Sequence, residues 1–349
     1  MKNRLIIPYF IPMKGCKYRC IYCNQYFLKE HDVDESVVET VTKYLNFSKR
    51  KDSSELAFYG GTFLNLSEQK IDAFLRIADD LKRKGLIDKI RISTTPDSVN
   101  EKKCNKIKGI VDIVELGVQT LDDRLLKLMR RGYTKKDCVE KTNLLRYYGF
   151  DIVYQLMLGL PLQSFQSFLD TIDIVCFKKP DAARLYPLLI LKNTPLEVYT
   201  KLKIIDYPTM EKIIQQGALA LLKLYKFGIT VIRIGLTEFF EKSNIVEGFV
   251  EHNWRTQMES LLWRLFFDTF VDEYGSKNLT IYCSRSDYDA IKGIKNKNMK
   301  YFYKKGYMFN IECCSEQIDK YELIINGLKC SLLDYESQIL FKLINNKDS

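Results

Sequence analysis

Histidine is almost absent from this sequence, and long apolar runs are missing. The 349 residues include only two histidines, His31 and His252, so few ligands are available for a zinc site of the usual kind. No stretch approaches the ~18 uninterrupted apolar residues that a membrane span requires, so no membrane segment is predicted. The opening MKNRLIIPYFIPM holds two prolines and no small-residue cleavage site. It therefore predicts the first strand of a cytoplasmic protein rather than a signal peptide.

Paired cysteine spacing is also lacking outside one short loop. Three of the ten cysteines, Cys16, Cys20 and Cys23, lie within eight positions, and the other seven are scattered. A disulfide framework is therefore not predicted, and a reducing compartment fits better. With 46% hydrophobic residues, the chain can bury a substantial core, as one large domain and a smaller one.

Strand-like and helix-like segments alternate over the first part of the chain. Apolar runs typical of strands occur at the start and in ELAFYGGTF, KIRISTTPDSV, IVELGVQT, DIVYQLMLGLP and AARLYPLLIL. Helical patterns separate them, for example over residues 122–129, 135–148 and 165–178. Six strands alternating with helices predict βαβ units and a partial (β/α)₆ barrel of the α/β class. Ligands of such barrels bind at the carboxyl ends of the strands, and the cysteines, GGT and GVQT all follow strand-like runs.

The alternation stops near residue 206, and three parts are predicted. Residues 1–227 form the barrel core with its closing helices. Residues 228–275 form a linking extension with one more strand and an aromatic-rich helix or helix pair. Residues 276–349 form a small basic α+β module, in which a strand, a helix and a strand follow one another up to residue 314. Between residues 277 and 305, eight Lys or Arg stand against two Asp, a surplus of +6 out of the net charge of +10.

The CxxxCxxC loop at residues 16–23 allows a zinc site, an iron-sulfur cluster or idle thiols. A zinc site usually completes its tetrahedron with a second CxxC pair or with histidines, and this sequence has no second pair and only two histidines. A 4Fe-4S cluster has four irons, so three cysteines leave one iron without a protein ligand. That iron is open to a substrate or a cofactor.

This cysteine spacing after a first strand, with Tyr22 directly before the third cysteine, resembles the radical S-adenosylmethionine (SAM) superfamily. The resemblance implies a 4Fe-4S cluster on Cys16, Cys20 and Cys23, with SAM bound to the fourth iron. Reductive cleavage of SAM then yields a 5'-deoxyadenosyl radical, and the electron comes from a donor such as flavodoxin or ferredoxin. No residue is assigned to a catalytic step, because the chemistry belongs to the cofactor.

Further motifs extend the resemblance along the core. YGGTF at residues 59–63 resembles the family's GGE-type motif, whose glycines let the backbone approach the methionyl amino group. Gln119 and Arg131 match positions that contact SAM, and a guanidinium suits the methionyl carboxylate. A simple turn at the two glycines, and plain surface positions for Gln119 and Arg131, are the alternatives. The residues implied in cofactor binding are Tyr22, Gly60, Gly61, Thr62, Thr94, Gln119, Arg131 and Gln155.

Within the superfamily, ISTTPDSV, ELGVQTLDDRLLKLMRRGYT and ARLYPLLILKNTPLEVY closely resemble the radical domain of the Elongator catalytic subunit and related bacterial proteins. Two positions depart from that pattern: Thr95 replaces an arginine, and Gln155 replaces an acidic residue or a histidine. The remaining residues hold no Gly-rich pyrophosphate loop, so neither an acetyltransferase domain nor acetyl-CoA is expected. Modification of RNA, such as tRNA, is the first expectation. The alternatives are radical chemistry on a small molecule such as a tetrapyrrole, or a non-catalytic RNA-binding protein with a structural metal centre.

The basic C-terminal segment holds a candidate nucleic-acid site. LTIYCSRSDYDAIKGIKNKNMKYF resembles a KH module, whose GXXG loop clamps a nucleic-acid backbone. Here Asn296 replaces the second glycine, and asparagine tolerates a left-handed conformation well. The candidate contacts are Gly293, Lys295, Asn296 and Lys297. A small α/β cap with a solvated lysine face is the alternative, as it is for the net positive charge.

Overall fold

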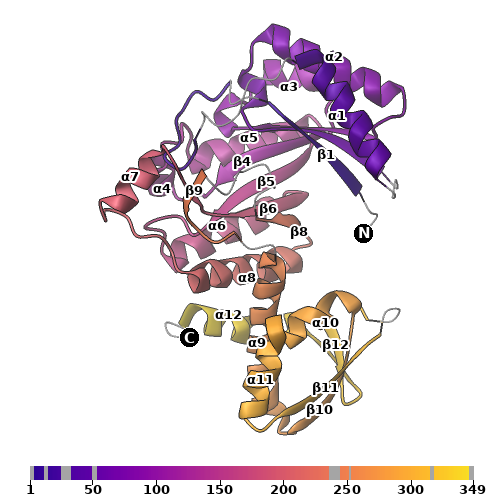
Figure 1. The fold of residues 1–349 in the computed structure, drawn as a ribbon, viewed down its shortest axis with the longest axis vertical. Helices are drawn as coiled ribbons and strands as arrows, with labels where there is room; N and C mark the ends of the chain where they lie inside the picture. The colour runs from indigo at the N-terminus through magenta and orange to yellow at the C-terminus, as the bar shows by residue number, and fades with distance from the viewer. Residues whose placement is uncertain are drawn as a thin grey trace.

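The main body of the protein is a curled sheet of parallel strands surrounded by helices (Figure 1). The computed structural model describes residues 4–11, 15–24, 33–48, 53–235, 244–250, 253–314 and 318–345. Within these residues, seven strands form the main sheet in the order β1-β2-β3-β4-β5-β6-β8. They are β1 (Arg4–Phe10), β2 (Ser53–Tyr59), β3 (Lys89–Thr94), β4 (Ile113–Gln119), β5 (Asp151–Leu158), β6 (Ala182–Pro187) and β8 (Thr230–Ile234). The predicted partial (β/α)₆ barrel is confirmed, and β8 adds a seventh strand beside β6.

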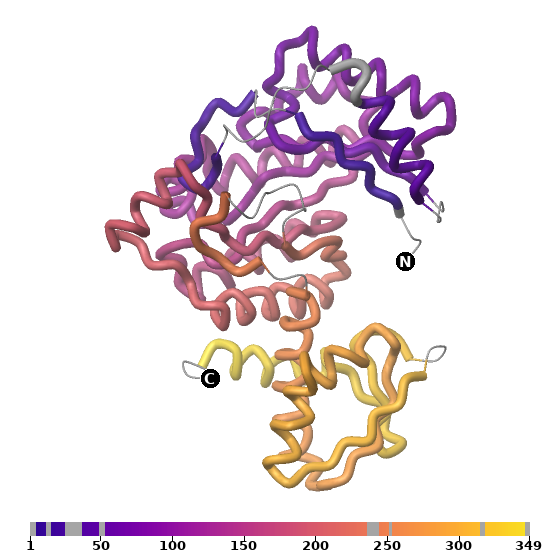
Figure 2. Tube along the Cα trace, in the orientation of Figure 1, coloured from indigo at the N-terminus to yellow at the C-terminus, as the bar shows by residue number. Residues whose placement is uncertain are grey.

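Helices follow most strands of this sheet, and the long ones lie on its outer side, while α7 (Pro195–Lys201) lies near the carboxyl edge (Figures 1 and 2). The helices are α1 (Val33–Phe47), η1 (Phe63–Asn65), α2 (Glu68–Arg83), η2 (Pro96–Ser98), α3 (Glu101–Ile107), α4 (Asp123–Leu128), α5 (Lys135–Tyr147), α6 (Phe165–Lys178), α7 and α8 (Met210–Lys226). A short antiparallel pair, β7 (Ile190–Leu191) with β9 (Ile245–Glu247), lies apart from the main sheet. The helical patterns over 122–129, 135–148 and 165–178 correspond to α4, α5 and α6.

The main hydrophobic core lies between the outer side of the sheet and the helices. Successive residues of a strand point to opposite sides, and Leu56 and Phe58 of β2 point into this core. Ser67 caps α2 by accepting a hydrogen bond from the Lys70 N–H, and the helix then places Phe74 against Phe58, with ring centroids 5.2 Å apart. Alternating strands and amphipathic helices thus build one continuous core.

The inner side of the same sheet carries paired charges instead. Arg91 of β3 donates to Glu55 of β2 and, over 2.8 Å, to Glu115 of β4. Arg184 of β6 lies 3.4 Å from Glu115, and the Gln155 amide of β5 donates to the same carboxylate over 2.5 Å. All four charged side chains are at most 5% exposed. Two positive and two negative charges therefore compensate one another across five neighbouring strands.

A smaller module follows the core and is joined to it by the long helix α9 (Trp254–Tyr274) (Figure 1). Its sheet has the order β11-β10-β12-β13. Its elements are β10 (Asn278–Cys283), α10 (Arg285–Lys292), η4 (Ile294–Asn296), α11 (Lys297–Lys304), β11 (Met308–Cys313), β12 (Glu322–Ile325), β13 (Leu328–Ser331), η5 (Leu332–Tyr335) and α12 (Glu336–Asn345). The aromatic-rich segment is thus one helix, and two helices stand between β10 and β11 where one was predicted. The domain boundaries at residues 227 and 275 stay predictions.

Most of helix α9 is buried because it packs against both parts of the molecule. Trp263, Phe266 and Phe267 are fully buried. On α8, Gly217 faces α9, and a Cβ at that position would lie 2.2 Å from the Met258 sulfur. The two helices therefore cross closely, and this contact holds the module to the core. Within the part of the chain that the structure describes, no helix is long and apolar enough to span a bilayer.

The inner charge network predicts a specific loss of stability. Replacing Arg91 by leucine leaves Glu55 and Glu115 buried with less positive charge around them, and breaking a buried ion pair in this way costs about 3–5 kcal/mol. We expect the urea midpoint of Arg91→Leu to fall accordingly, as followed by circular dichroism. The control Lys84→Met removes an exposed ion pair with Asp80 and should leave the midpoint almost unchanged. Equal midpoints for both variants would contradict this account of the inner side.

Candidate cofactor site

The cysteine loop is anchored by one apolar residue between two of the cysteines. Ile21 is fully buried and belongs to a second hydrophobic cluster with Met129 and Leu196. Its N–H donates to the Met129 carbonyl over 3.3 Å, and its carbonyl accepts from the Leu196 N–H over 2.9 Å. At the end of the loop, the Asn24 amide donates to the Lys192 carbonyl. The loop is therefore fixed to the end of α4 and the start of α7.

This anchoring brings the three thiols to the carboxyl edge of the sheet. Cys20 is buried, while Cys16 and Cys23 are half-buried. The Cys23 N–H donates to the Cys20 carbonyl over 3.1 Å, and the Cys16 sulfur lies 3.5 Å from the Thr62 hydroxyl. Burial, together with the nearby thiols of Cys20 and Cys16, raises the pKa of Cys23 to about 12. A metal centre at this loop must therefore displace the Cys23 proton when it binds.

The Arg131 guanidinium connects the cysteine loop to the sheet. Its Nη1 lies 3.1 Å from the Cys20 sulfur and 3.2 Å from the Tyr22 hydroxyl. Its Nη2 donates to the Gly117 carbonyl at the end of β4 over 2.8 Å, and its Nε donates to the Tyr133 hydroxyl over 2.6 Å. These contacts occupy four of the five N–H donors of an arginine. Tyr22 and Arg131, both predicted in the site, thus lie together beside Cys20.

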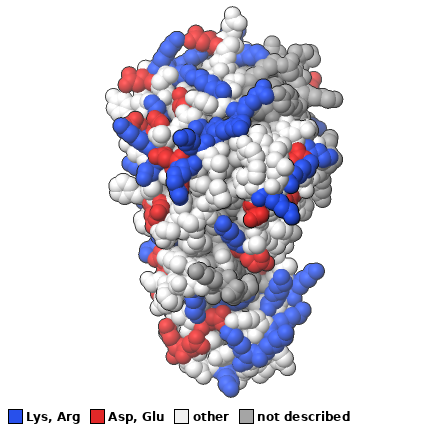
Figure 3. All heavy atoms as spheres, turned by 90° about the vertical axis from the view of Figure 1, so that its left-hand side faces the viewer, with Lys and Arg blue, Asp and Glu red and all other residues white. Residues whose placement is uncertain are grey.

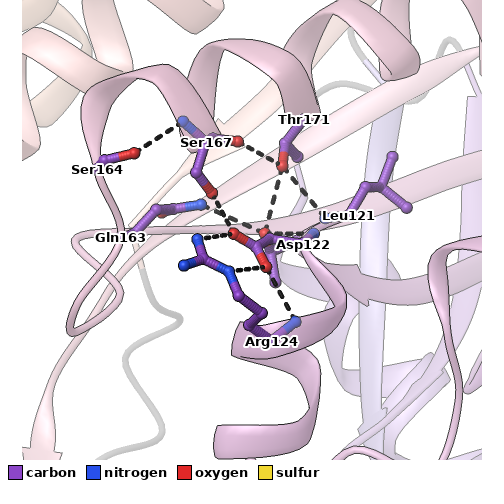
Figure 4. A network of polar contacts seen from close by, with 8 residues as sticks. Leu121, Asp122, Arg124, Gln163, Ser164, Ser167 and Thr171 are labelled. Atoms are coloured by element: carbon purple, nitrogen blue, oxygen red, sulfur yellow. Dashed lines mark hydrogen bonds and ion pairs between the residues drawn. The ribbon is translucent and has the colours of Figure 1, made fainter.

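Gln119 ends β4 with a left-handed backbone, at φ 66°. The turn that follows it is held by side chains of α6 (Figure 4). The Leu121 N–H donates to the Thr171 hydroxyl over 3.2 Å, and the Ser167 hydroxyl donates to the Asp122 carboxylate over 2.7 Å. Burial tends to raise the pKa of Asp122, but hydrogen bonds from Arg124 and Ser167 hold it below its usual value. The charged Asp122 caps α4, so the turn presents Gln119 in one orientation.

Two glycines bring backbone segments together at this edge. Gly60 has φ 99°, and a Cβ there would lie 2.7 Å from the Ile11 carbonyl at the end of β1. Gly15 has φ 100°, and a Cβ there would lie 2.5 Å from the Thr62 carbonyl. The GGT turn and the start of the cysteine loop therefore pack directly on each other. This packing is a structural requirement for Gly60 in addition to the contact with SAM implied by the resemblance.

Two of the predicted cofactor residues, Thr94 and Gln155, make their hydrogen bonds away from the cysteine loop. The Thr94 hydroxyl lies 2.6 Å from the Ser98 hydroxyl in the turn after β3. Gln155 belongs to the inner charge network, where it also donates to the Ser93 hydroxyl over 3.3 Å. The site that the described contacts bring together consists of Cys16, Cys20, Tyr22, Cys23, Gly60, Gly61, Thr62, Gln119 and Arg131.

The predicted nucleic-acid loop lies in the C-terminal module, between α10 and α11. Lys295, Asn296 and Lys297 are exposed, and both Lys295 and Asn296 have left-handed backbones, at φ 53° and 60°. The left-handed Asn296 was predicted, and the left-handed Lys295 was not. Gly293 is buried, and a Cβ there would lie 2.9 Å from the Ser260 hydroxyl of α9. Gly293 is thus required for helix packing, so its presence alone does not indicate a nucleic-acid clamp.

The donor set at the cysteine loop fits a 4Fe-4S cluster with one open iron. All ten cysteines are free thiols, and three of them lie on this loop. Among the described residues, no three His, Cys, Asp or Glu side chains converge closely enough to hold a single metal ion. A four-iron cluster is larger, and each cysteine binds a different iron, so its thiolates stand farther apart than those of a zinc ion. His31 and His252 lie outside the described residues.

Two residues of this site, Tyr133 and Tyr18, escaped sequence-based prediction. Tyr133 donates to the Gly117 carbonyl and accepts from Arg131. Tyr18 packs over Gly132, where a Cβ would lie 1.8 Å from its ring. The spacing of the aromatic residues in KYRCIYC and RRGYT gives no periodic pattern, so only the fold reveals that these segments meet. A charged residue inside an apolar strand, such as Arg91 in KIRIST, is a pattern from which the inner network could have been predicted.

A curled parallel sheet with three thiols and an arginine at its carboxyl edge is the arrangement of an α/β protein with a ligand site at that edge. The family model described as "Radical SAM superfamily" matches residues 10–175, a little under half of the chain, so this part of the chain is similar to that superfamily. Its members generally use a 4Fe-4S cluster and SAM. The prediction of a radical SAM enzyme that resembles the Elongator radical domain is confirmed at the level of this class.

Known proteins resemble shares of the chain that differ in length. A tRNA uridine(34) acetyltransferase of Dehalococcoides mccartyi is 32% identical over 175 residues, which are 43% of this chain and 37% of that protein. The heme chaperone HemW of Buchnera aphidicola is 23% identical over 312 residues, 86% of this chain and 77% of that one. The archaeal Methanocaldococcus infernus Elp3 structure shares the fold, with a TM-score of 0.56 and 19% identity over 79% of this chain and 64% of that one. The chain thus spans little more than a third of the acetyltransferase.

The contacts of Arg131 predict how the site responds to a conservative change. Lysine keeps the charge but lacks the planar fork, so it cannot replace several directed hydrogen bonds. A hydrogen bond to a charged group contributes about 1.5–3 kcal/mol, so Arg131→Lys should weaken SAM binding roughly tenfold or more in anaerobic calorimetry on the reconstituted protein. Lys127→Met, an exposed change on α4, is the control and should bind SAM as the unaltered protein does. Unchanged SAM affinity in Arg131→Lys would exclude this role.

Proposed function

We propose that this chain is a radical enzyme in which Cys16, Cys20 and Cys23 hold a 4Fe-4S cluster. When bound, the cluster and SAM supply one-electron cleavage and the 5'-deoxyadenosyl radical. The observation that carries the proposal is the convergence of three thiols and the Arg131 guanidinium at the carboxyl edge of a parallel sheet. Ligands of parallel barrels bind at this edge.

The residues of this chain have positioning roles in the proposal. Arg131 holds Cys20 and Tyr22 in place and keeps one N–H donor free for a carboxylate. Gln119 extends from a rigid turn, and its amide makes no hydrogen bond to other described residues, so it is available to a ligand. The apolar cluster around Ile21 keeps water away from the base of the loop. These features support a site that is formed before the cofactor arrives.

The cluster assignment is tested by product formation. Anaerobic reconstitution should give about four irons per chain, and a reductant should then release 5'-deoxyadenosine from SAM. Cys20→Ala removes one ligand and should abolish release, whereas Cys104→Ala, a change at a buried thiol of α3, should keep it. A Cys20→Ala protein that still forms 5'-deoxyadenosine would exclude the proposal. One equivalent of zinc with no SAM cleavage would indicate the non-catalytic alternative.

RNA is the substrate class that we propose, and α11 supplies the main support. Lys297, Lys300 and Lys304 are exposed and lie at helical spacing on one face. Tyr303 is 72% exposed among them, and exposed aromatic rings between lysines suit stacked bases and a phosphate backbone. In Figure 3, Lys and Arg side chains gather on one side of the lower module. The likeness to a tRNA uridine(34) acetyltransferase supports the same class.

A tetrapyrrole is the second candidate, and one comparison favours it. The likeness to the protein named heme chaperone HemW extends over 86% of this chain, whereas the likeness to the acetyltransferase covers 43%. The HemW likeness therefore includes part of the C-terminal module. A tetrapyrrole carries carboxylates, so lysines on this module are compatible with it as well.

RNA binding can be separated from tetrapyrrole binding by its salt dependence. Replacing Lys297, Lys300 and Lys304 together by glutamine should weaken binding of tRNA. It should also make the slope of log K against log salt shallower by about 2, since each phosphate contact contributes about 0.7 for single strands. A matched triple change at the exposed lysines 84, 108 and 136 should leave the slope unaltered. Salt-insensitive tRNA binding, with a heme Soret shift on titration, would favour the tetrapyrrole instead.

A further inference from the structure

A cavity of about 410 Å³ opens beside the cysteine loop. Neither the proposed cofactor site nor the proposed RNA surface on α11 uses this cavity. It lies between the start of the loop, η1 and the first turns of α2 and α3. Cys16 is one of the residues that line it, so the cavity directly adjoins a predicted cluster ligand. Its other polar lining residues include Lys17, Asn65, Lys102, Lys103 and Lys106.

The charge of this cavity is strongly positive. Four lysines line it, against the single carboxylate of Glu68. Lys102 pairs with Glu68 and Lys106 with Asp72, each over 2.7 Å. Among the described residues, no carboxylate lies within ion-pair distance of the other two lysines, Lys17 and Lys103.

Lys17 and Lys103 line the same cavity, and their positive charges repel each other. Lys103 donates to the Asn65 side chain over 2.8 Å, which holds its ammonium at the cavity wall. Burial lowers the pKa of Lys103, and the positive charge of Lys17 lowers it further. The Asp97 carboxylate opposes this shift to a smaller extent. Two like charges with no carboxylate at ion-pair distance disfavour each other, and an anionic surface placed against them relieves that repulsion.

The cavity lies beside Cys16, and this position indicates which kind of anionic partner would bind there. A cluster held by Cys16 must receive an electron from outside, and electron transfer between proteins slows steeply as the redox centres move apart. The carrier must therefore dock near the cysteine loop. Electrostatic complementarity accelerates such encounters, and redox complexes form with small interfaces.

We propose that this basic cavity, centred on Lys17 and Lys103, is the docking site for an acidic one-electron carrier protein. The inference rests on the proposed function, because it requires a cluster at the loop. The carrier loses one electron and the cluster gains it, and no bond forms or breaks at the surface. RNA is assigned to α11, and RNA at the cavity is one of the outcomes of the test.

The test measures binding and turnover separately. A reduced flavodoxin is titrated into the reconstituted protein by calorimetry at several salt concentrations. Lys17→Glu changes an exposed residue, and Lys103→Gln keeps a donor for Asn65. We expect each variant to weaken flavodoxin binding at least tenfold and to reduce its salt dependence. Lys84→Glu, at the far end of α2 and roughly 24 Å of helix away, is the matched charge control and should bind as the unaltered protein does.

Dithionite separates the docking site from the radical chemistry. Iron content and dithionite-driven release of 5'-deoxyadenosine should be the same in Lys17→Glu and the unaltered protein, while flavodoxin-driven release falls. Unchanged flavodoxin affinity in both variants would overturn the docking site. So would variants that lose tRNA affinity and keep flavodoxin affinity. If dithionite fails in the unaltered protein, the proposed function fails, and the calorimetry still decides whether the cavity binds the carrier.

Discussion

The Arg131 guanidinium is the interaction on which the arrangement of the site depends. It contacts the Cys20 sulfur and the Tyr22 hydroxyl of the loop, and it donates to the Gly117 carbonyl of β4. A short loop rich in polar residues has little apolar surface with which to fix itself, apart from Ile21. One planar side chain with five donors can hold the loop against the sheet in a defined geometry. The place of the Cys20 thiol follows from this connection, and the Ile21 anchor and the Gly15 contact with Thr62 place the rest of the loop.

The two sides of the sheet support this geometry in different ways. On the outer side, apolar strand residues and helix faces form one core, which makes the sheet rigid. On the inner side, Glu55, Arg91, Glu115 and Arg184 are paired, so the row of charges next to the site is balanced. The turn after β4 is then fixed by Asp122 and Thr171. Rigid strands and a rigid turn present Gln119 and Arg131 to the same space.

Much of this fold was predictable because its pattern is local and repeated. Six strand-like runs, the helices over 122–129, 135–148 and 165–178, and the cysteine loop were each predicted from spacing. The contacts between distant segments could not be predicted, because Tyr133 and Tyr18 belong to no helical or strand pattern in the sequence. Gly293 was interpreted as a loop glycine, but its backbone packs against Ser260 of α9. The requirement for glycine there comes from this close contact with α9, which the sequence alone does not reveal. The second helix before β11 was missed because the left-handed Lys295 in η4 interrupts the helical pattern, and a lysine gives no sequence signal for that conformation.

The central claim is that three cysteines leave one iron of a cluster open to SAM. The most direct measurement is electron paramagnetic resonance of the anaerobically reconstituted, reduced protein with and without SAM. The account predicts about four irons per chain, a signal of a reduced 4Fe-4S cluster, and a change in its g values when SAM is added. Iron in that amount with a signal that SAM leaves unchanged would contradict the claim, as would a centre that contains zinc alone.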